Sequence, residues 1–104
     1  MMSVAELPIE FDQDKVADFC RQRGIARLSL FGSVLRDDFD PLTSDVDVFA
    51  EFLPGALRGV GLDYFDYGRD LSAILGHKVD FCSRLNKHLQ SVVRDEMLVV
   101  YEQA

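Results

Sequence analysis

Two aspartates separated by one residue stand at the start of the apolar run 46–52. Alternate residues of a strand point to the same side, so the carboxylates of Asp45 and Asp47 should project together, about 6–7 Å apart. Such carboxylates repel each other unless a cation or a proton lies between them. Upstream, Gly32 and Ser33 close another apolar run, where a glycine lets a phosphate approach the backbone amides. This spacing predicts a site for Mg²⁺ carrying a phosphate chain.

A third acid and one base extend this candidate site. Asp80 stands inside a short run that alternates polar and apolar residues, where an aspartate is unfavourable without a task or a partner. If its strand lies beside the strand bearing Asp45 and Asp47, three carboxylates meet. That arrangement suits two-metal phosphoryl transfer, with Asp80 as general base or metal ligand. Arg36, the one base among five acids in 34–47, suits a phosphate oxygen and a surface ion pair almost equally.

Helices and strands that would position these residues alternate along the chain, which implies a layered α/β or α+β domain covering residues 1–104. The glycines and prolines mark where elements end. The predicted elements are a helix capped by Asp12 or Asp14 and ended by Gly24, a strand Ile25–Phe31, a short helix Val34–Arg36, a loop Asp37–Thr43, a strand Val46–Phe52, a helical segment within Leu57–Leu75, a strand Lys78–Cys82, a last helix capped by Ser83, and a strand or docked tail Leu98–Tyr101.

Apolar residues at helical spacing predict the buried faces. The first helix should bury Val16, Phe19 and Cys20. The segment 57–75 should bury one apolar stripe, made of Leu62, Phe65, Leu71, Ile74 and Leu75. We expect Phe65 in the core, whereas Tyr64 and Tyr67 suit the core rim and a partner surface about equally.

Composition excludes several classes of protein. A net charge of −7 opposes tight binding to a nucleic-acid polymer, although it allows a nucleotide accompanied by Mg²⁺. No apolar stretch reaches the length of a membrane span, and residues 1–10 lack the features of a signal peptide. Cys20 and Cys82 have no metal-ligand spacing and are expected to be reduced thiols. A cytoplasmic protein without a membrane partner is therefore expected.

Together these residues resemble the nucleotidyltransferase superfamily that includes DNA polymerase beta and the aminoglycoside adenylyltransferases. The chain looks most like the minimal nucleotidyltransferases, the MNT-type antitoxins of prokaryotes. The shared pattern is Gly-Ser, a spacer, Asp-x-Asp at the start of a strand, and a third acid on a later strand. The similar segments extend over nearly the whole chain and are 28–33, Arg36, 44–48, 75–80 and 99–102.

This resemblance implies a nucleotidyltransferase fold, with a small mixed sheet flanked by helices. It implies a Mg²⁺-dependent transfer of AMP from ATP to a tyrosine of a HEPN-type ribonuclease toxin, with which the antitoxin forms a hetero-oligomer. The residues implied to bind the nucleotide are Gly32, Ser33, Arg36 and Ser44. The residues implied to hold two Mg²⁺ ions and to carry catalysis are Asp45, Asp47 and Asp80.

The chain departs from the family pattern on its phosphate side. Family members often have an arginine directly after Gly-Ser, then a small residue, and a glycine after the later arginine. Here these positions are Val34, Leu35 and Asp37, and the spacer is about one residue longer. Two alternatives therefore stay open. One is an antitoxin that neutralises its toxin by binding alone, and the other, ranked last, is an adenylyltransferase acting on a small molecule.

Overall fold

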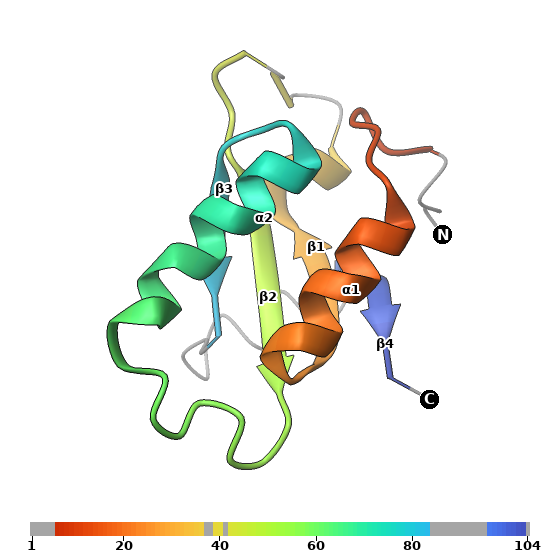
Figure 1. The fold of residues 1–104 in the computed structure, drawn as a ribbon. Helices are drawn as coiled ribbons and strands as arrows, with labels where there is room; N and C mark the ends of the chain where they lie inside the picture. Colours follow the sequence, from red (N-terminus) through yellow and green to blue (C-terminus); the bar gives the residue numbers. More distant parts are fainter. Residues whose placement is uncertain (1–5, 37–38, 41, 84–95, 104) are drawn as a thin grey trace.

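The chain folds into a mixed four-stranded sheet that carries α-helices on one face (Figure 1). This computed structural model describes residues 6–36, 39–40, 42–83 and 96–103. The elements are α1 (Gln13–Arg23), β1 (Ile25–Phe31), the 3₁₀ helix η2 (Gly32–Leu35), β2 (Val46–Phe52), the 3₁₀ helix η3 (Gly61–Asp66), α2 (Tyr67–Leu75), β3 (Val79–Cys82) and β4 (Leu98–Glu102). The predicted α+β class is confirmed, and the helix predicted after Ser83 lies outside the described residues.

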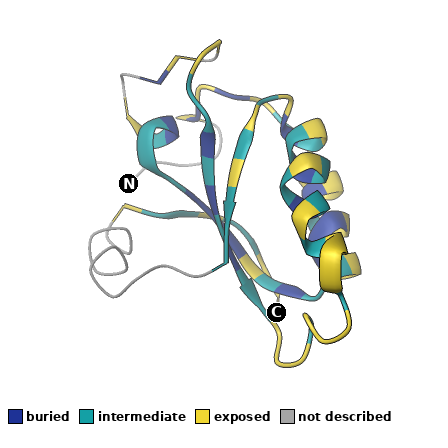
Figure 2. Cartoon of the chain, turned by 90° about the vertical axis from the view of Figure 1, so that its left-hand side faces the viewer, coloured by how far each residue is buried: buried dark blue, intermediate teal, exposed yellow. Residues whose placement is uncertain are grey.

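The strands lie in the order β3-β2-β1-β4. β1 is antiparallel to both β2 and β4, whereas β2 and β3 are parallel. The tail is thus a true strand, Leu98–Glu102. A parallel pair needs a crossover connection, and here it is formed by η3 and α2. Seen from the side, α1 and α2 stand together on one face of the sheet (Figure 2).

Alternating burial along β2 fixes which side chains face the helices. Val46, Val48 and Ala50 are fully buried, and the residues between them are only half-buried. Ala50 and Val48 pair with Leu28 and Leu30 of β1, which are buried as well. A slip of one residue would turn this whole apolar set to the other face, so the core determines the register of the sheet.

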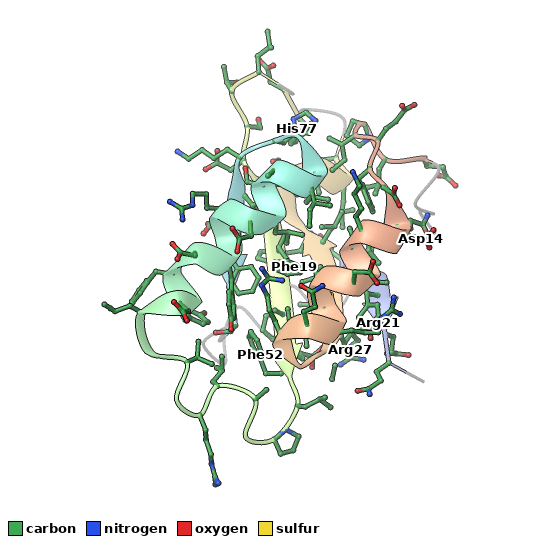
Figure 3. The ribbon with its side chains drawn as sticks, viewed as in Figure 1. Asp14, Phe19, Arg21, Arg27, Phe52 and His77 are labelled. Carbon is green, nitrogen blue, oxygen red and sulfur yellow. The ribbon has the colours of Figure 1, made fainter. Side chains whose placement is uncertain are left out.

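Helix α1 begins and ends where the sequence predicts. Asp12 is the N-cap, and its side chain accepts hydrogen bonds from two first-turn amides at 2.9 and 3.3 Å. Gly24 ends the helix with φ 72°, and its N–H donates to the carbonyl of Cys20. Val16, Phe19 and Cys20 are buried, as expected. Phe19 lies between the helix and the sheet (Figure 3).

The segment between β2 and β3 differs from the prediction. Its α-helix begins only at Tyr67, and η3 precedes it. With three residues per turn, Leu62 and Phe65 fall into one row, and they are 81% and 75% exposed. Expecting these two side chains in the core was therefore wrong, whereas Leu71 and Leu75 are buried. The physical reason lies in the left-handed glycines that shape the approach to η3, which are Gly55, Gly59 and Gly61.

The tyrosines of this segment belong to the core and its rim. Tyr67 is 9% exposed and stacks on Phe52, with ring centroids 6.2 Å apart. Tyr64 is half-buried, and its hydroxyl lies 2.5 Å from the Ser83 hydroxyl. Phe81 completes this aromatic cluster. Figure 3 shows Phe52 on the helix side of β2.

Both cysteines are free thiols, Cys20 buried and Cys82 half-buried. Among the described parts of the chain, no helix is long and apolar enough to cross a membrane.

The contrast between Leu71 and Leu62 can be measured with one substitution at two positions. Leu71→Ala should lower the free energy of unfolding by about 2–5 kcal/mol, because it leaves a cavity in the core. Leu62→Ala should change it by less than about 0.5 kcal/mol, because that side chain is exposed. Urea denaturation of both variants tests this, and equal losses would contradict the exposure of Leu62.

Candidate active site

Three aspartates of the predicted site come from two neighbouring strands. In the parallel ladder of β2 and β3, Asp47 is paired with Asp80. Asp45 stands two residues before Asp47, just ahead of β2. Paired residues project to the same side of a sheet, and Val46 and Val48 already occupy the helix side. The carboxylates of Asp47 and Asp80 therefore share the face opposite the helices, which is the neighbourhood that the sequence required.

The start of β2 is held in place by the backbone. The Val46 N–H donates to the carbonyl of Lys78 at 2.8 Å, which extends the β2–β3 ladder one step beyond the paired residues. On the other side, Asp47 is paired with Phe31, the last residue of β1. Asp47 thus lies between two strands, and its position along the sheet follows from both.

Gly32 makes room for the Asp47 carboxylate. A Cβ atom at Gly32 would lie 2.2 Å from Oδ2 of Asp47, closer than two such atoms can approach. Gly32 also has φ 77°, a conformation that side-chain-bearing residues rarely adopt. The glycine of the Gly-Ser pair is thus required both for the turn that ends β1 and for the carboxylate beside it.

The predicted short helix after Gly-Ser is the 3₁₀ helix η2, which starts at Gly32 itself and buries Val34. The N–H of Arg36 closes it by donating to the carbonyl of Ser33 at 2.9 Å. The Arg36 side chain is exposed, yet its charge acts on Asp47. Arg36, which follows the Gly-Ser turn, is therefore close enough to Asp47 for its positive charge to favour the ionised carboxylate.

The loop before β2 is organised by Asp40, which the sequence suggested only as a solubilising loop residue. Its carboxylate accepts from the Leu42 N–H at 2.9 Å, and its carbonyl accepts from the Ser44 N–H at 2.8 Å. In return, the Ser44 hydroxyl oxygen accepts from the Asp40 N–H at 3.1 Å. An aspartate in a loop that contains a proline is the signal for such a turn. The Ser44 hydroxyl keeps its own hydrogen for another acceptor.

The negative charges of Asp80 and Asp45 repel that of Asp47. Burial raises the pKa of Asp47 above its ordinary value, and the charges of Asp80 and Asp45 raise it further, while Arg36 opposes them. Burial together with Asp80 and Asp47 also raises the pKa of the Cys82 thiol on β3. An added cation would favour the ionised carboxylates and relieve this repulsion.

The donor set suits a hard cation. Carboxylate oxygens are the ligands that Mg²⁺ prefers, and Asp45, Asp47 and Asp80 supply them from one end of the β2–β3 pair. Within the described residues, no three His, Cys, Asp or Glu side chains are already arranged around one point as metal ligands. The space that Gly32 leaves for the Asp47 carboxylate is the local feature that fits such a group.

A second polar residue of this face was missed by the sequence reasoning. Ser29 of β1 pairs with Phe49, two residues from Asp47 on the same side of β2. Ser29 is 1% exposed, and its hydroxyl has no hydrogen-bond partner among the described residues. The signal in the sequence is a lone serine inside an apolar strand.

The comparisons with known proteins agree with this geometry. Residues 13–99 match the family model of the nucleotidyltransferase domain. A solved structure described as a minimal nucleotidyltransferase is 31% identical, with a TM-score of 0.65, over 83% of this chain and 86% of that one. No curated protein is similar enough in sequence to count as a match.

More distant structures share the fold alone. A chain of a toxin–antitoxin with AMP-PNP is 16% identical, with a TM-score of 0.66, over 88% of this chain and 74% of that one. A chain from the tri-AMPylated Shewanella oneidensis HEPN toxin in complex with MNT antitoxin is 15% identical, with a TM-score of 0.59, over 88% and 70%.

The contact between Gly32 and Asp47 can be isolated with a matched pair of variants. Gly59 has φ 71° and nothing within 4 Å of an added Cβ, whereas Gly32 has φ 77° and the Asp47 carboxylate. Gly59→Ala should cost about 1 kcal/mol through backbone strain alone. Gly32→Ala should cost at least about 1 kcal/mol more, because it also displaces the carboxylate. Urea denaturation measures both, and equal costs would contradict the contact.

The repulsion can be tested through the pH dependence of stability. The pKa of Asp47 is higher in the folded chain than in the unfolded one, so the folded chain holds more protons between the two pKa values. Its free energy of unfolding therefore falls as pH rises through that window. Asp80→Asn removes one source of the shift and should make this fall smaller. The variant should gain stability relative to wild type between about pH 3 and pH 7.

Urea denaturation in the presence of EDTA measures this difference. Glu96→Gln, at an exposed position that is not among the charges acting on Asp47, is the control. A stability difference between Asp80→Asn and wild type that does not change with pH would contradict the coupling.

Proposed function

Because the chain belongs to the nucleotidyltransferase domain family, we propose that it transfers AMP from ATP to a tyrosine of a cognate HEPN-type toxin and so acts as an antitoxin. The observation that carries the proposal is the pairing of Asp47 with Asp80, with Asp45 beside them and Gly32 against the Asp47 carboxylate. Nucleotidyl transfer needs carboxylates at one point next to a turn that admits a triphosphate.

Each site residue has a role in this proposal. Asp45, Asp47 and Asp80 would hold two Mg²⁺ ions, which would supply positive charge to the triphosphate. Gly32 and Ser33 would hold phosphate oxygens through the backbone at the start of η2. Arg36 and the Ser44 hydroxyl would donate to the nucleotide. These assignments rest on the position of each residue around the start of β2.

The transfer is a substitution at the α-phosphorus of ATP. The tyrosine oxygen forms a bond to that phosphorus, while the bond from the phosphorus to the oxygen that leads to the β-phosphate breaks. Pyrophosphate leaves, and the proton of the tyrosine hydroxyl goes to Asp80, which is exposed on the face where an acceptor protein can approach. AMP remains attached to the acceptor through a phosphodiester.

The partner is proposed from the structural neighbours. They include an MNT antitoxin in complex with an AMPylated HEPN toxin and a toxin–antitoxin with an ATP analogue. An acidic chain of net charge −7 also suits a protein acceptor better than a nucleic-acid polymer.

A second function, neutralisation of the toxin by binding alone, is favoured by the phosphate side of the site. Val34 stands where family members often have an arginine, and it is a fully buried apolar residue, so it offers nothing to a phosphate. Arg36 is the one described cation that acts on Asp47. Transfer and occlusion make opposite predictions for an Asp47 variant.

Asp47→Asn separates the two functions. With ATP labelled at the α-phosphate, Mg²⁺ and the purified toxin, wild type should label the toxin. The variant should label it at least about 100-fold more slowly, because a carboxylate at the metal is lost. Calorimetry should show that the variant still binds the toxin, since Asn keeps the shape of Asp.

Neutralisation of the toxin is assayed in parallel, with Glu96→Gln as the control. Under the transfer proposal Asp47→Asn loses neutralisation, whereas under occlusion it keeps it. No labelling by wild type would refute transfer.

A further inference from the structure

Lys78 is a basic residue beside the acid cluster to which the proposed site assigns no role. It stands two residues before Asp80, and its carbonyl accepts from the Val46 N–H at 2.8 Å. In the parallel ladder of β2 and β3, Val46 is paired with Val79. The two residues that precede them, Asp45 and Lys78, therefore face each other across strands that lie about 5 Å apart.

The Lys78 side chain belongs to the same face of the sheet as the carboxylates. Successive side chains along a strand point to opposite faces. Val79 packs against the core on the helix side, so Lys78 and Asp80, which flank it, project to the other face. Lys78 is exposed there. A cation thus stands at the edge of a cluster made of acids.

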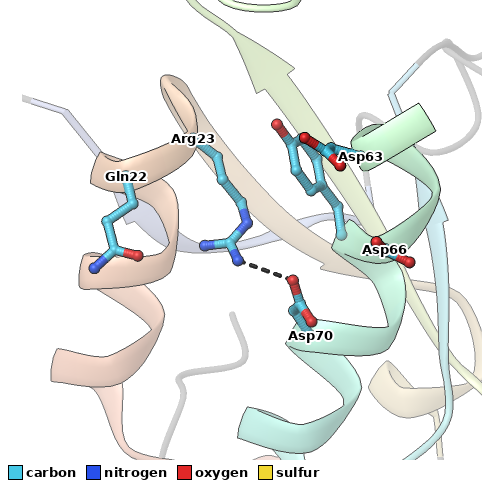
Figure 4. A pocket seen from close by; sticks show the side chains of 6 residues that line it. Gln22, Arg23, Asp63, Asp66 and Asp70 are labelled. Atoms are coloured by element: carbon cyan, nitrogen blue, oxygen red, sulfur yellow. Dashed lines mark hydrogen bonds and ion pairs between the residues drawn. The ribbon is translucent and has the colours of Figure 1, made fainter. Parts of the chain in front are cut away.

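Lys78 is also unpaired, unlike half of the described basic residues. Arg23 of α1 pairs with Asp70 of α2 at 2.9 Å in the pocket between these helices (Figure 4). Three other arginines are likewise paired with carboxylates: Arg21 with Asp18, Arg27 with Glu51 and Glu102, and Arg69 with Asp66. Lys78 makes no hydrogen bond or ion pair through its side chain with any described residue, and it is not among the charges that act on Asp47. Its ammonium is therefore available to a ligand.

The order of the strands determines which end of the substrate Lys78 would meet. β1, which runs into Gly32, lies on one side of β2, and β3 lies on the other. In the proposed reaction the departing phosphates are held at Gly32 and Ser33, on the β1 side. The attacking and leaving oxygens of a phosphoryl transfer lie roughly in line, so the attacking oxygen comes from the β3 side. Lys78 and Asp80 are the charged residues that stand on that side.

We propose that Lys78 is a catalytic residue on the acceptor side of the site, where its ammonium donates to the oxygen of the attacking tyrosine. This role rests on the proposed transfer reaction. As the hydroxyl proton moves to Asp80, the tyrosine oxygen gains negative charge, and a cation beside it favours that charge. The oxygen then bonds to the α-phosphorus and pyrophosphate leaves. Lys78 keeps its own protons throughout.

Rates of toxin labelling, measured over a range of ATP and toxin concentrations, test this role. Lys78→Met keeps an unbranched side chain and removes the charge. It should lower kcat at least about tenfold, because the cation at the attacking oxygen is lost. KM for ATP should change less than about threefold, because the triphosphate is held on the other side of β2. Lys78→Arg keeps the charge and should restore kcat to within about threefold of wild type.

Lys15→Met is the matched control, since Lys15 is an exposed lysine of α1, which lies on the opposite face of the sheet. It should keep the wild-type kcat, and unfolding curves check that every variant is folded. The role of Lys78 is overturned if Lys78→Met keeps the wild-type kcat, whether or not KM for ATP or for the toxin rises. It is also overturned if Lys15→Met is equally slow or if Lys78→Arg restores nothing. Absence of labelling by wild type would overturn the transfer reaction itself, and this role with it.

Discussion

The contact on which the candidate site depends is an unfavourable one, the pairing of Asp47 with Asp80 across two parallel strands. Like charges at paired positions repel. Burial raises the pKa of Asp47, and the charges of Asp80 and Asp45 raise it further. The pairing persists because it is imposed from the other face of the sheet. Val46 and Val48 are fully buried under the helices, and turning Asp47 to the other face of the sheet would expose them. The hydrophobic core thus offsets the electrostatic repulsion between the aspartates of the site.

The connection between β2 and β3 determines both the position of Asp80 and the segment that lies on the helix face of the sheet. The two strands are parallel, so the chain must return across the helix face, and it does so through η3 and α2. The same crossover that brings Asp80 beside Asp47 therefore also places Leu62 and Phe65 of η3 at the surface. Gly55, Gly59 and Gly61, all with positive φ, let the chain turn from β2 into η3. The acid cluster and η3 lie on opposite faces of one sheet for this topological reason.

The features that depend only on the spacing of nearby residues could be predicted from the sequence. Alternation placed Asp45 and Asp47 on one side, and the capping residues Asp12 and Gly24 gave both ends of α1. The pairing of β3 with β2 could not be predicted in this way, because it depends on tertiary packing across the crossover. From the sequence, it could be stated only as the condition under which the three carboxylates would meet. Leu62 and Phe65 were misplaced because a 3.6-residue period was assumed where the helix is 3₁₀. The hydrogen bonds of Asp40 and the orphan hydroxyl of Ser29 are visible only once the backbone is known.

The excess of negative charge among the three aspartates bears on whether these residues have a function. A chain that only occluded a toxin would gain nothing from three carboxylates that repel one another, and replacing any of them by an amide would relieve the cost. Gly32 points the same way, because a turn with φ 77° leaves room for the Asp47 carboxylate where a Cβ would fill it. Among the described residues only Arg36 counters the charge on Asp47. A cation brought in with a nucleotide would turn this repulsion into binding energy, so the unfavourable contact favours the proposed transfer over occlusion alone.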